Sequence, residues 1–147
     1  MTFTRILTGA AAAVLAMHTG AAEFRSAAED AVILYDAPSV QSQKLFIVSQ
    51  GYPLEVVVTV QGWVKVRDAS GALSWVDARK VSIKPRMVMV KAAQAPVRQA
   101  ADDASALVFQ AQQNVLLELT ETSGAWLKVK HRDGATGFIR ASSVWGV

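Results

Sequence analysis

The chain of 147 residues contains no cysteine, and this absence removes several classes of protein at once. Disulfide frameworks, thiolate metal sites and cysteine nucleophiles are all excluded. Histidine is scarce as well, with His18 and His131 the only two. Zinc sites and Ser–His catalytic sites need histidine together with further ligands or partners. The sequence therefore predicts a protein that is not an enzyme and that holds no metal and no cofactor.

Neither positive nor negative charge predominates in the chain. The 15 basic and 12 acidic residues are interspersed and leave a net charge of only +3. No glycine-rich phosphate loop is present. Neighbouring carboxylates such as Asp102 and Asp103 lie in polar stretches, where we expect them to be solvated rather than arranged for acid–base catalysis. We expect no nucleic-acid partner.

Only one long apolar run occurs, from Ile6 to Met17, preceded by Arg5 and followed by small residues. This pattern is typical of a secretory signal peptide, predicted here as residues 1–22 and cut after Ala22 or, as the alternative, after Ala21. An uncleaved anchor is the rival interpretation, but twelve residues of helix span about 18 Å of a core of about 30 Å. The remaining 125 residues contain no comparable run, so we expect no membrane span after cleavage and a periplasmic or secreted location.

What the chain does have is an internal repeat. Residues 31–82 align without a gap with residues 94–145 at an offset of 63, and 14 of the 52 pairs are identical. Trp63 and Trp126 are one such pair. A period near 60 residues corresponds to a small domain. We therefore predict two modules, module 1 at residues 23–84 and module 2 at residues 85–147. Because modules of this size are marginally stable alone, we expect one to dock on the other.

Strand signals dominate both modules. Short segments rich in β-branched and aromatic residues alternate with turns that contain glycine, asparagine or proline. The predicted strands are Leu45–Val48, Leu54–Val60, Trp63–Arg67 and Ser74–Asp77, then Met87–Val90, Leu107–Ala111, Val115–Glu121, Trp126–His131 and Thr136–Arg140. Two stretches with helical character, Ser26–Ala31 and Arg98–Ala106, have no full amphipathic period, so we expect a loop or a single turn in each.

These residues resemble the bacterial SH3-like domain family. The resemblance covers nearly all of the chain past residue 22 and is carried by Gly62-Trp63-Val64-Lys65-Val66-Arg67, Gly71 and Trp75-Val76, and again by Trp126-Leu127-Lys128-Val129 and Gly137-Phe138-Ile139. It implies an all-β fold of two tandem SH3-like small β-barrels, each five-stranded and partly open. Members of the family are usually non-catalytic, and many accompany a peptidoglycan-cleaving enzyme domain, which is not present here.

The eukaryotic relatives of this fold bind proline-rich peptides in an aromatic groove. Module 1 keeps two of the aromatic positions of that groove, Tyr35 and Trp63, whereas module 2 keeps only Trp126. The loop that would carry acidic residues, Ser39–Gln43, has no carboxylate. We therefore do not expect recognition of proline motifs.

The candidate ligand-binding residues follow from strand alternation, which places neighbouring side chains on opposite faces. Val64 and Val66 are predicted core residues, as are their counterparts in module 2. The opposite face carries a tryptophan and cations in both modules and could stack a sugar ring or a peptide while the cations hold carboxylates. The candidates are Tyr35, Trp63, Lys65, Arg67, Trp126, Lys128 and Lys130. The alternative is that each tryptophan covers a loop and the cations are merely solvated.

The other aromatic residues have structural interpretations. Trp75 and Phe138 occupy equivalent positions, where a large ring is expected to close the barrel rather than meet a ligand. Trp145 has Ser82 as its counterpart, so we predict that it packs between the modules. His131 is expected to be a surface residue.

The sequence thus predicts a non-catalytic, exported binding or scaffold protein of the cell envelope. Its partner would be a cell-wall glycan or peptide, or an envelope protein. The alternative function is a structural subunit that docks to an envelope or peptidoglycan-processing enzyme. The sequence leaves open whether both modules bind, and the divergence of Tyr35 and Asp36 from Arg98 and Gln99 favours a loss of binding in one of them.

Overall fold

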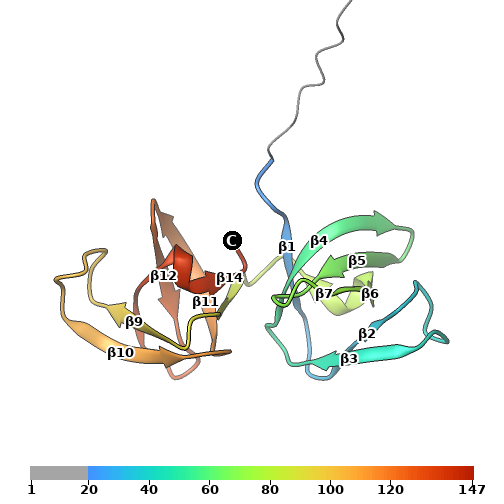
Figure 1. Ribbon diagram of the computed structural model, residues 1–147, viewed down its shortest axis with the longest axis horizontal. Coiled ribbons are helices and arrows are strands. Elements are labelled where there is room, and N and C mark those ends of the chain that lie inside the picture. Colours follow the sequence, from blue (N-terminus) through green and yellow to red (C-terminus); the bar gives the residue numbers. More distant parts are fainter. Residues whose placement is uncertain (1–19) are drawn as a thin grey trace, which may run out of the picture.

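A computed structural model describes residues 20–147, which form two β-sheet modules joined by a short segment at residues 83–86 (Figure 1). The predicted signal peptide, residues 1–22, lies almost entirely outside the described residues. The predicted all-β fold is confirmed, since short 3-10 turns are the sole helical elements within residues 20–147. In this described part, no helix is long and apolar enough to cross a membrane.

Module 1 is an antiparallel sheet of seven strands in the order β3-β2-β6-β5-β4-β1-β7. The strands are β1 (Phe24–Ala27), β2 (Val32–Tyr35), β3 (Lys44–Val48), β4 (Pro53–Val60), β5 (Trp63–Arg67), β6 (Leu73–Asp77) and β7 (Val81–Ser82), with the 3-10 turn η1 (Ala78–Lys80) before β7. The order is open, with β3 and β7 at the two edges, so the ladder of backbone hydrogen bonds does not close into a barrel.

Module 2 repeats this topology in the order β10-β9-β13-β12-β11-β8-β14. Its strands are β8 (Met87–Val90), β9 (Gln94–Arg98), β10 (Leu107–Gln112), β11 (Leu116–Ser123), β12 (Trp126–Lys130), β13 (Thr136–Arg140) and β14 (Val144–Trp145), with η2 (Ala141–Ser143) before β14. Even the irregularities repeat, because the register shifts between Val56 and Val58 in β4 and between Leu119 and Glu121 in β11. The internal repeat therefore describes the structure strand by strand.

Each module has seven strands, whereas five were expected. β2, β7, β9 and β14 were not among the strands predicted from the sequence, and neither was β1, Phe24–Ala27. It contains no β-branched residue, and it is a strand because it pairs with β4 on one side and β7 on the other. The two stretches with helical character form turns and loops as predicted, except that Ser26 and Ala27 belong to β1 and Arg98 ends β9.

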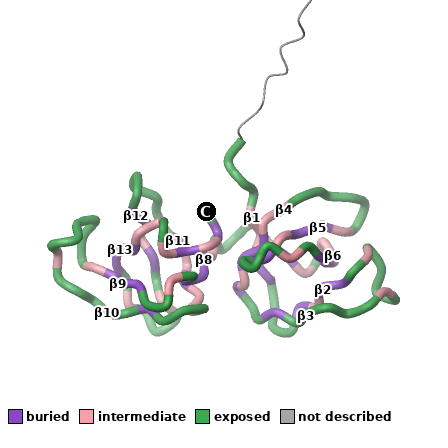
Figure 2. Tube along the Cα trace, viewed as in Figure 1, coloured by how far each residue is buried: buried purple, intermediate pink, exposed green. Residues whose placement is uncertain are grey.

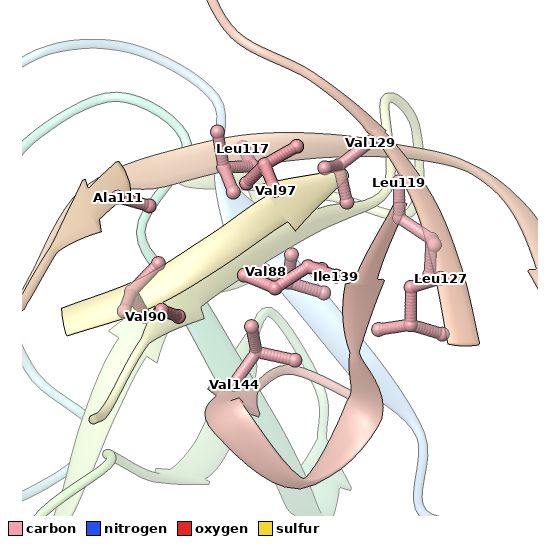
Figure 3. Packing of buried hydrophobic residues seen from close by; sticks show 11 residues of the cluster. Val88, Val90, Val97, Ala111, Leu117, Leu119, Leu127, Val129, Ile139 and Val144 are labelled. Atoms are coloured by element: carbon pink, nitrogen blue, oxygen red, sulfur yellow. The ribbon is translucent and has the colours of Figure 1, made fainter. Parts of the chain in front are cut away.

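Each module has its own hydrophobic core, and the two clusters have no residue in common (Figure 2). The module 1 cluster contains Leu34, Leu54, Val64 and Val66, all fully buried. Figure 3 shows the module 2 cluster, in which Leu117, Leu127, Val129 and Ile139 converge from three strands. Burying apolar side chains in this way supplies most of the stability of a fold without disulfides. The midpoint of the chain is thus a boundary between two cores.

The modules contact each other near the chain's C-terminus, as predicted for Trp145. The Trp145 ring meets Phe24 edge-on, with 5.1 Å between centroids, and its Nε1 donates a hydrogen bond to the carbonyl oxygen of Pro53 at 3.2 Å. The next residue, Gly146, has φ +123°, and a Cβ there would lie 2.7 Å from the carbonyl oxygen of Met87. Only glycine fits this backbone without strain. The C-terminal residues therefore tie module 2 to module 1.

Candidate functional site

The alternation predicted for β5 is confirmed. Val64 and Val66 are fully buried, whereas Trp63, Lys65 and Arg67 are half-buried on the other side of the strand. Residues directly opposite one another on neighbouring strands share a face of the sheet. The register therefore identifies which side chains accompany Trp63 and Lys65.

Four neighbours complete this face. Trp75 of β6 lies opposite both Lys65 and Tyr35, and β4 places Val58 opposite Lys65 and Val60 opposite Trp63. The two valines are 44% and 40% exposed. We call this surface the outer face of module 1, and it consists of Tyr35, Val58, Val60, Trp63, Lys65 and Trp75.

The aromatic rings of the outer face contact one another. Tyr35 and Trp63 meet edge to face, with 5.6 Å between centroids and 86° between planes. The Lys65 Nζ lies 5.8 Å from the Trp75 ring centroid, which is a cation–π distance. Tyr35 is itself buried and packs against Trp63. The rings of Trp63 and Trp75 are half-buried, so they remain partly accessible. The face can stack a flat or ring-shaped ligand beside one cation.

The structure does not leave Arg67 available as a second cation. Its guanidinium Nη1 lies 2.8 Å from Glu55 Oε2, the side chain directly opposite on β4. Asp77, opposite Trp63, is likewise engaged, since the Arg79 side chain and backbone N–H both donate to it and hold its pKa at about 2. Lys65 is thus the cation of the outer face that forms no salt bridge within residues 20–147.

Module 2 presents a different surface at the equivalent positions. Trp126 is only 7% exposed, because Arg140 lies over its ring with the guanidinium carbon 4.4 Å from the centroid. Arg140 is held there by Asp103 of the loop before β10. Where module 1 has Asp77 opposite its tryptophan, module 2 has this arginine. The Trp126 ring is therefore covered and cannot stack on a ligand in this arrangement.

The remaining positions of module 2 are polar. Glu121 and Ser123 stand where module 1 has Val58 and Val60, and Arg98 stands where module 1 has Tyr35. Lys128 lies opposite Phe138, the counterpart of Trp75. The predicted site residues Trp126 and Lys128 thus lie on one face of β12, but the Trp126 ring is covered by Arg140. Lys130 instead lines a cleft between the two modules.

Sequence reasoning did not place Val58, Val60 or Trp75 on this face. The signal was available in the repeat, because the offset of 63 sets both valines against polar residues in module 2. The His131 side chain also makes more contacts than expected of a surface residue. Its ring lies 5.8 Å from Phe109, and its Nδ1 lies 3.0 Å from Asp133 Oδ1. Residues 20–147 contain no group of three or more side chains suited to hold a metal ion.

The sequence profile of the bacterial SH3 domain matches residues 28–82 and again residues 91–146. The chain belongs to the bacterial SH3 domain family. Each matched segment covers one sheet except for its first strand, β1 or β8, so the predicted pair of bacterial SH3 domains is confirmed. A comparison with curated protein sequences finds no match.

Three solved structures resemble the bacterial SH3 pair at low similarity. They are NlpC2 from Trichomonas vaginalis (9% identity, 85% of this chain and 48% of that chain covered, TM-score 0.37), NlpC1 from the same organism (10%, 88% and 47%, 0.37) and an NlpC/P60 family protein from Bacillus cereus (14%, 83% and 55%, 0.38). The present chain spans about half the length of each of these structures.

Proposed function

We propose that this protein is a non-catalytic binding protein of the cell envelope, exported to the periplasm or secreted, whose module 1 binds a cell-wall fragment on its outer face. The observation that carries the proposal is the contrast between the two modules. One fold, used twice, carries accessible aromatic rings and valines in module 1 and covered or charged side chains at the same positions in module 2. Core packing is alike in both modules, so it does not account for this difference.

The chemistry of the outer face fits a fragment of wall glycan with its attached peptide. Indole rings stack on the apolar faces of sugar rings and on peptide planes, and the two valines extend that apolar surface. Lys65 adds one cation that can pair with a carboxylate. The family is typical of envelope and wall-associated proteins, which supports the same ligand class. The chain has no cysteine, so it offers no thiol nucleophile.

The test replaces the two valines by the residues that module 2 carries. Val58→Glu with Val60→Ser alters exposed side chains on the outer face and leaves the core intact. We expect this double variant to lose retention by purified peptidoglycan about tenfold or more. Ile83→Glu, at an exposed apolar residue of the linker, is the control for a new negative charge and should be retained like the unmodified protein.

Near-ultraviolet circular dichroism should show an intact fold in every variant. Equal retention of the double variant and the unmodified protein would exclude the outer face as the wall-binding surface. A Trp63→Ala variant gives a second measurement, since it removes the stacking ring without adding charge. It should weaken retention to a similar extent.

A second candidate function, a structural subunit that docks to an envelope enzyme, is favoured by the edge strand β3. Ile47 and Phe46 of β3 are 70% and 48% exposed, and an edge strand offers unpaired backbone groups to a further strand. In module 2, Gln110 replaces Ile47, and Phe109 is partly buried against the core. A stoichiometric partner that co-purifies with the protein, and is lost with Ile47→Lys, would support this function over wall binding.

A further inference from the structure

A cleft of about 950 Å³ lies between the modules, apart from the outer face. Module 1 contributes the turn that contains Asp30, the linker contributes Lys84 and Pro85, and module 2 contributes β11, β12 and the turn after β12. The volume falls in the range of sites that bind small ligands. The two modules that form its walls are held together by the contacts of Trp145 with Phe24 and Pro53. The cleft therefore exists because the modules dock.

Cations in the cleft lack partners. Lys84, Lys130 and Arg132 all line it, and none of the three forms a salt bridge with any residue in the described part of the chain. His131 lies beside them and faces Asp133. Three unpaired positive charges around one concave volume favour a ligand that carries carboxylates.

Carboxylates also reach the cleft. Asp30 and Glu118 line it, and Asp30 is fixed in place because its Oδ1 accepts a hydrogen bond from the backbone N–H of Gln50 at 3.0 Å. These two negative charges disfavour polyanions such as nucleic acids or anionic membrane surfaces. They suit a ligand that has an ammonium group as well as carboxylates.

The repeat provides an internal comparison for Glu118. In module 1, the cross-strand pair Glu55 and Arg67 closes into a salt bridge of 2.8 Å. In module 2, Glu118 and Lys130 occupy the same register, but they form no salt bridge, and both line the cleft. A carboxylate and an ammonium that stand opposite each other without pairing are free to meet the opposite charges of one ligand.

We propose that this cleft binds a short zwitterionic peptide that has a free amino terminus and free carboxylates. Lys130, Arg132 and Lys84 hold the carboxylates, and Glu118 accepts hydrogen bonds from the ammonium group. The site is distinct from the outer face of module 1 and does not depend on wall binding there.

The test uses the dipeptide alanyl-glutamate, which has one ammonium group and two carboxylates, and follows its binding to the mature protein by amide chemical shifts. We expect shifts at Asn114, Glu118 and Lys130, with an affinity in the millimolar range or better. Lys130→Ala with Arg132→Ala should weaken binding about tenfold or more. Lys91→Ala, at an exposed cation outside the cleft, is the matched control and should leave the affinity unchanged.

A second probe tests the role of Glu118. The N-acetylated dipeptide lacks the ammonium group and should bind the unmodified protein several-fold more weakly. In Glu118→Gln the two forms should bind equally. Val58→Glu should not alter dipeptide affinity, which separates this site from the outer face. An absence of shifts at millimolar dipeptide, or an affinity that the Lys130 and Arg132 changes leave intact, would overturn the proposal.

Discussion

Replacing Trp145 by alanine tests how strongly the two modules stabilise each other. Truncating a fully buried tryptophan costs about 3–5 kcal/mol, and Trp145 is half-buried between Phe24 and Pro53. Trp145→Ala should therefore lose about half of that free energy, together with about 1 kcal/mol for the hydrogen bond from its Nε1. We expect Trp145→Ala to lower the free energy of unfolding by about 2.5–3.5 kcal/mol and the thermal midpoint by roughly 10 °C.

Trp145→Phe is the matched control. It keeps an aromatic ring against Phe24 but removes the donor to the Pro53 carbonyl oxygen. We expect it to lose about 1 kcal/mol. Circular dichroism during denaturation of residues 23–147 measures both variants. If Trp145→Ala unfolds at the same midpoint as the unmodified protein, the contact does not couple the modules.

Two further predictions concern single positions. Gly137→Ala should cost about 1–3 kcal/mol, because a Cβ there would lie 2.6 Å from Val97 Cγ1 and 2.7 Å from the Arg98 carbonyl oxygen. Its control is Ser74→Ala at the equivalent position, which should be near neutral because the buried Ser74 hydroxyl has no hydrogen-bond partner in the described structure; equal losses in the two denaturation curves would contradict this reasoning. Hydrogen bonds from Arg79 lower the Asp77 pKa to about 2. The stabilisation from this pair should be complete above pH 3.8, the ordinary Asp77 value, and be lost as the pH falls toward 2. An NMR titration of the Asp77 carboxyl carbon should show the low pKa rising in Arg79→Ala, and an unchanged value would contradict the assigned cause.

The strands of both modules could largely be predicted from local sequence. Residues 63–67 alternate between aliphatic and polar side chains, and the structure buries Val64 and Val66 accordingly. Because the two sheets have the same strand order, the same strand predictions apply to module 2. β1 could not be predicted in this way. Phe24–Ala27 has little intrinsic strand preference, and its conformation depends on pairing with β4 and β7.

The candidate site was predicted only in part. Sequence alternation places Trp63 and Lys65 on one face, but it cannot say what stands beside them. Cross-strand register adds Val58 and Val60 to that face and pairs Arg67 with Glu55, which removes this cation from it. These pairings depend on the register of the β4–β5 hairpin and on its irregularity between Val56 and Val58, which the alternation within a single strand does not report.

The sequence by itself determined that this protein is one fold used twice, because the spacing of apolar residues and turns repeats at an offset of 63. The tertiary structure alone decided that the two copies present different surfaces at equivalent positions. Trp63 stays partly accessible, whereas Arg140, held by Asp103, covers Trp126. The physical reason is that strand formation depends on local pattern, while the exposure of a side chain depends on the loops and strands that pack over it.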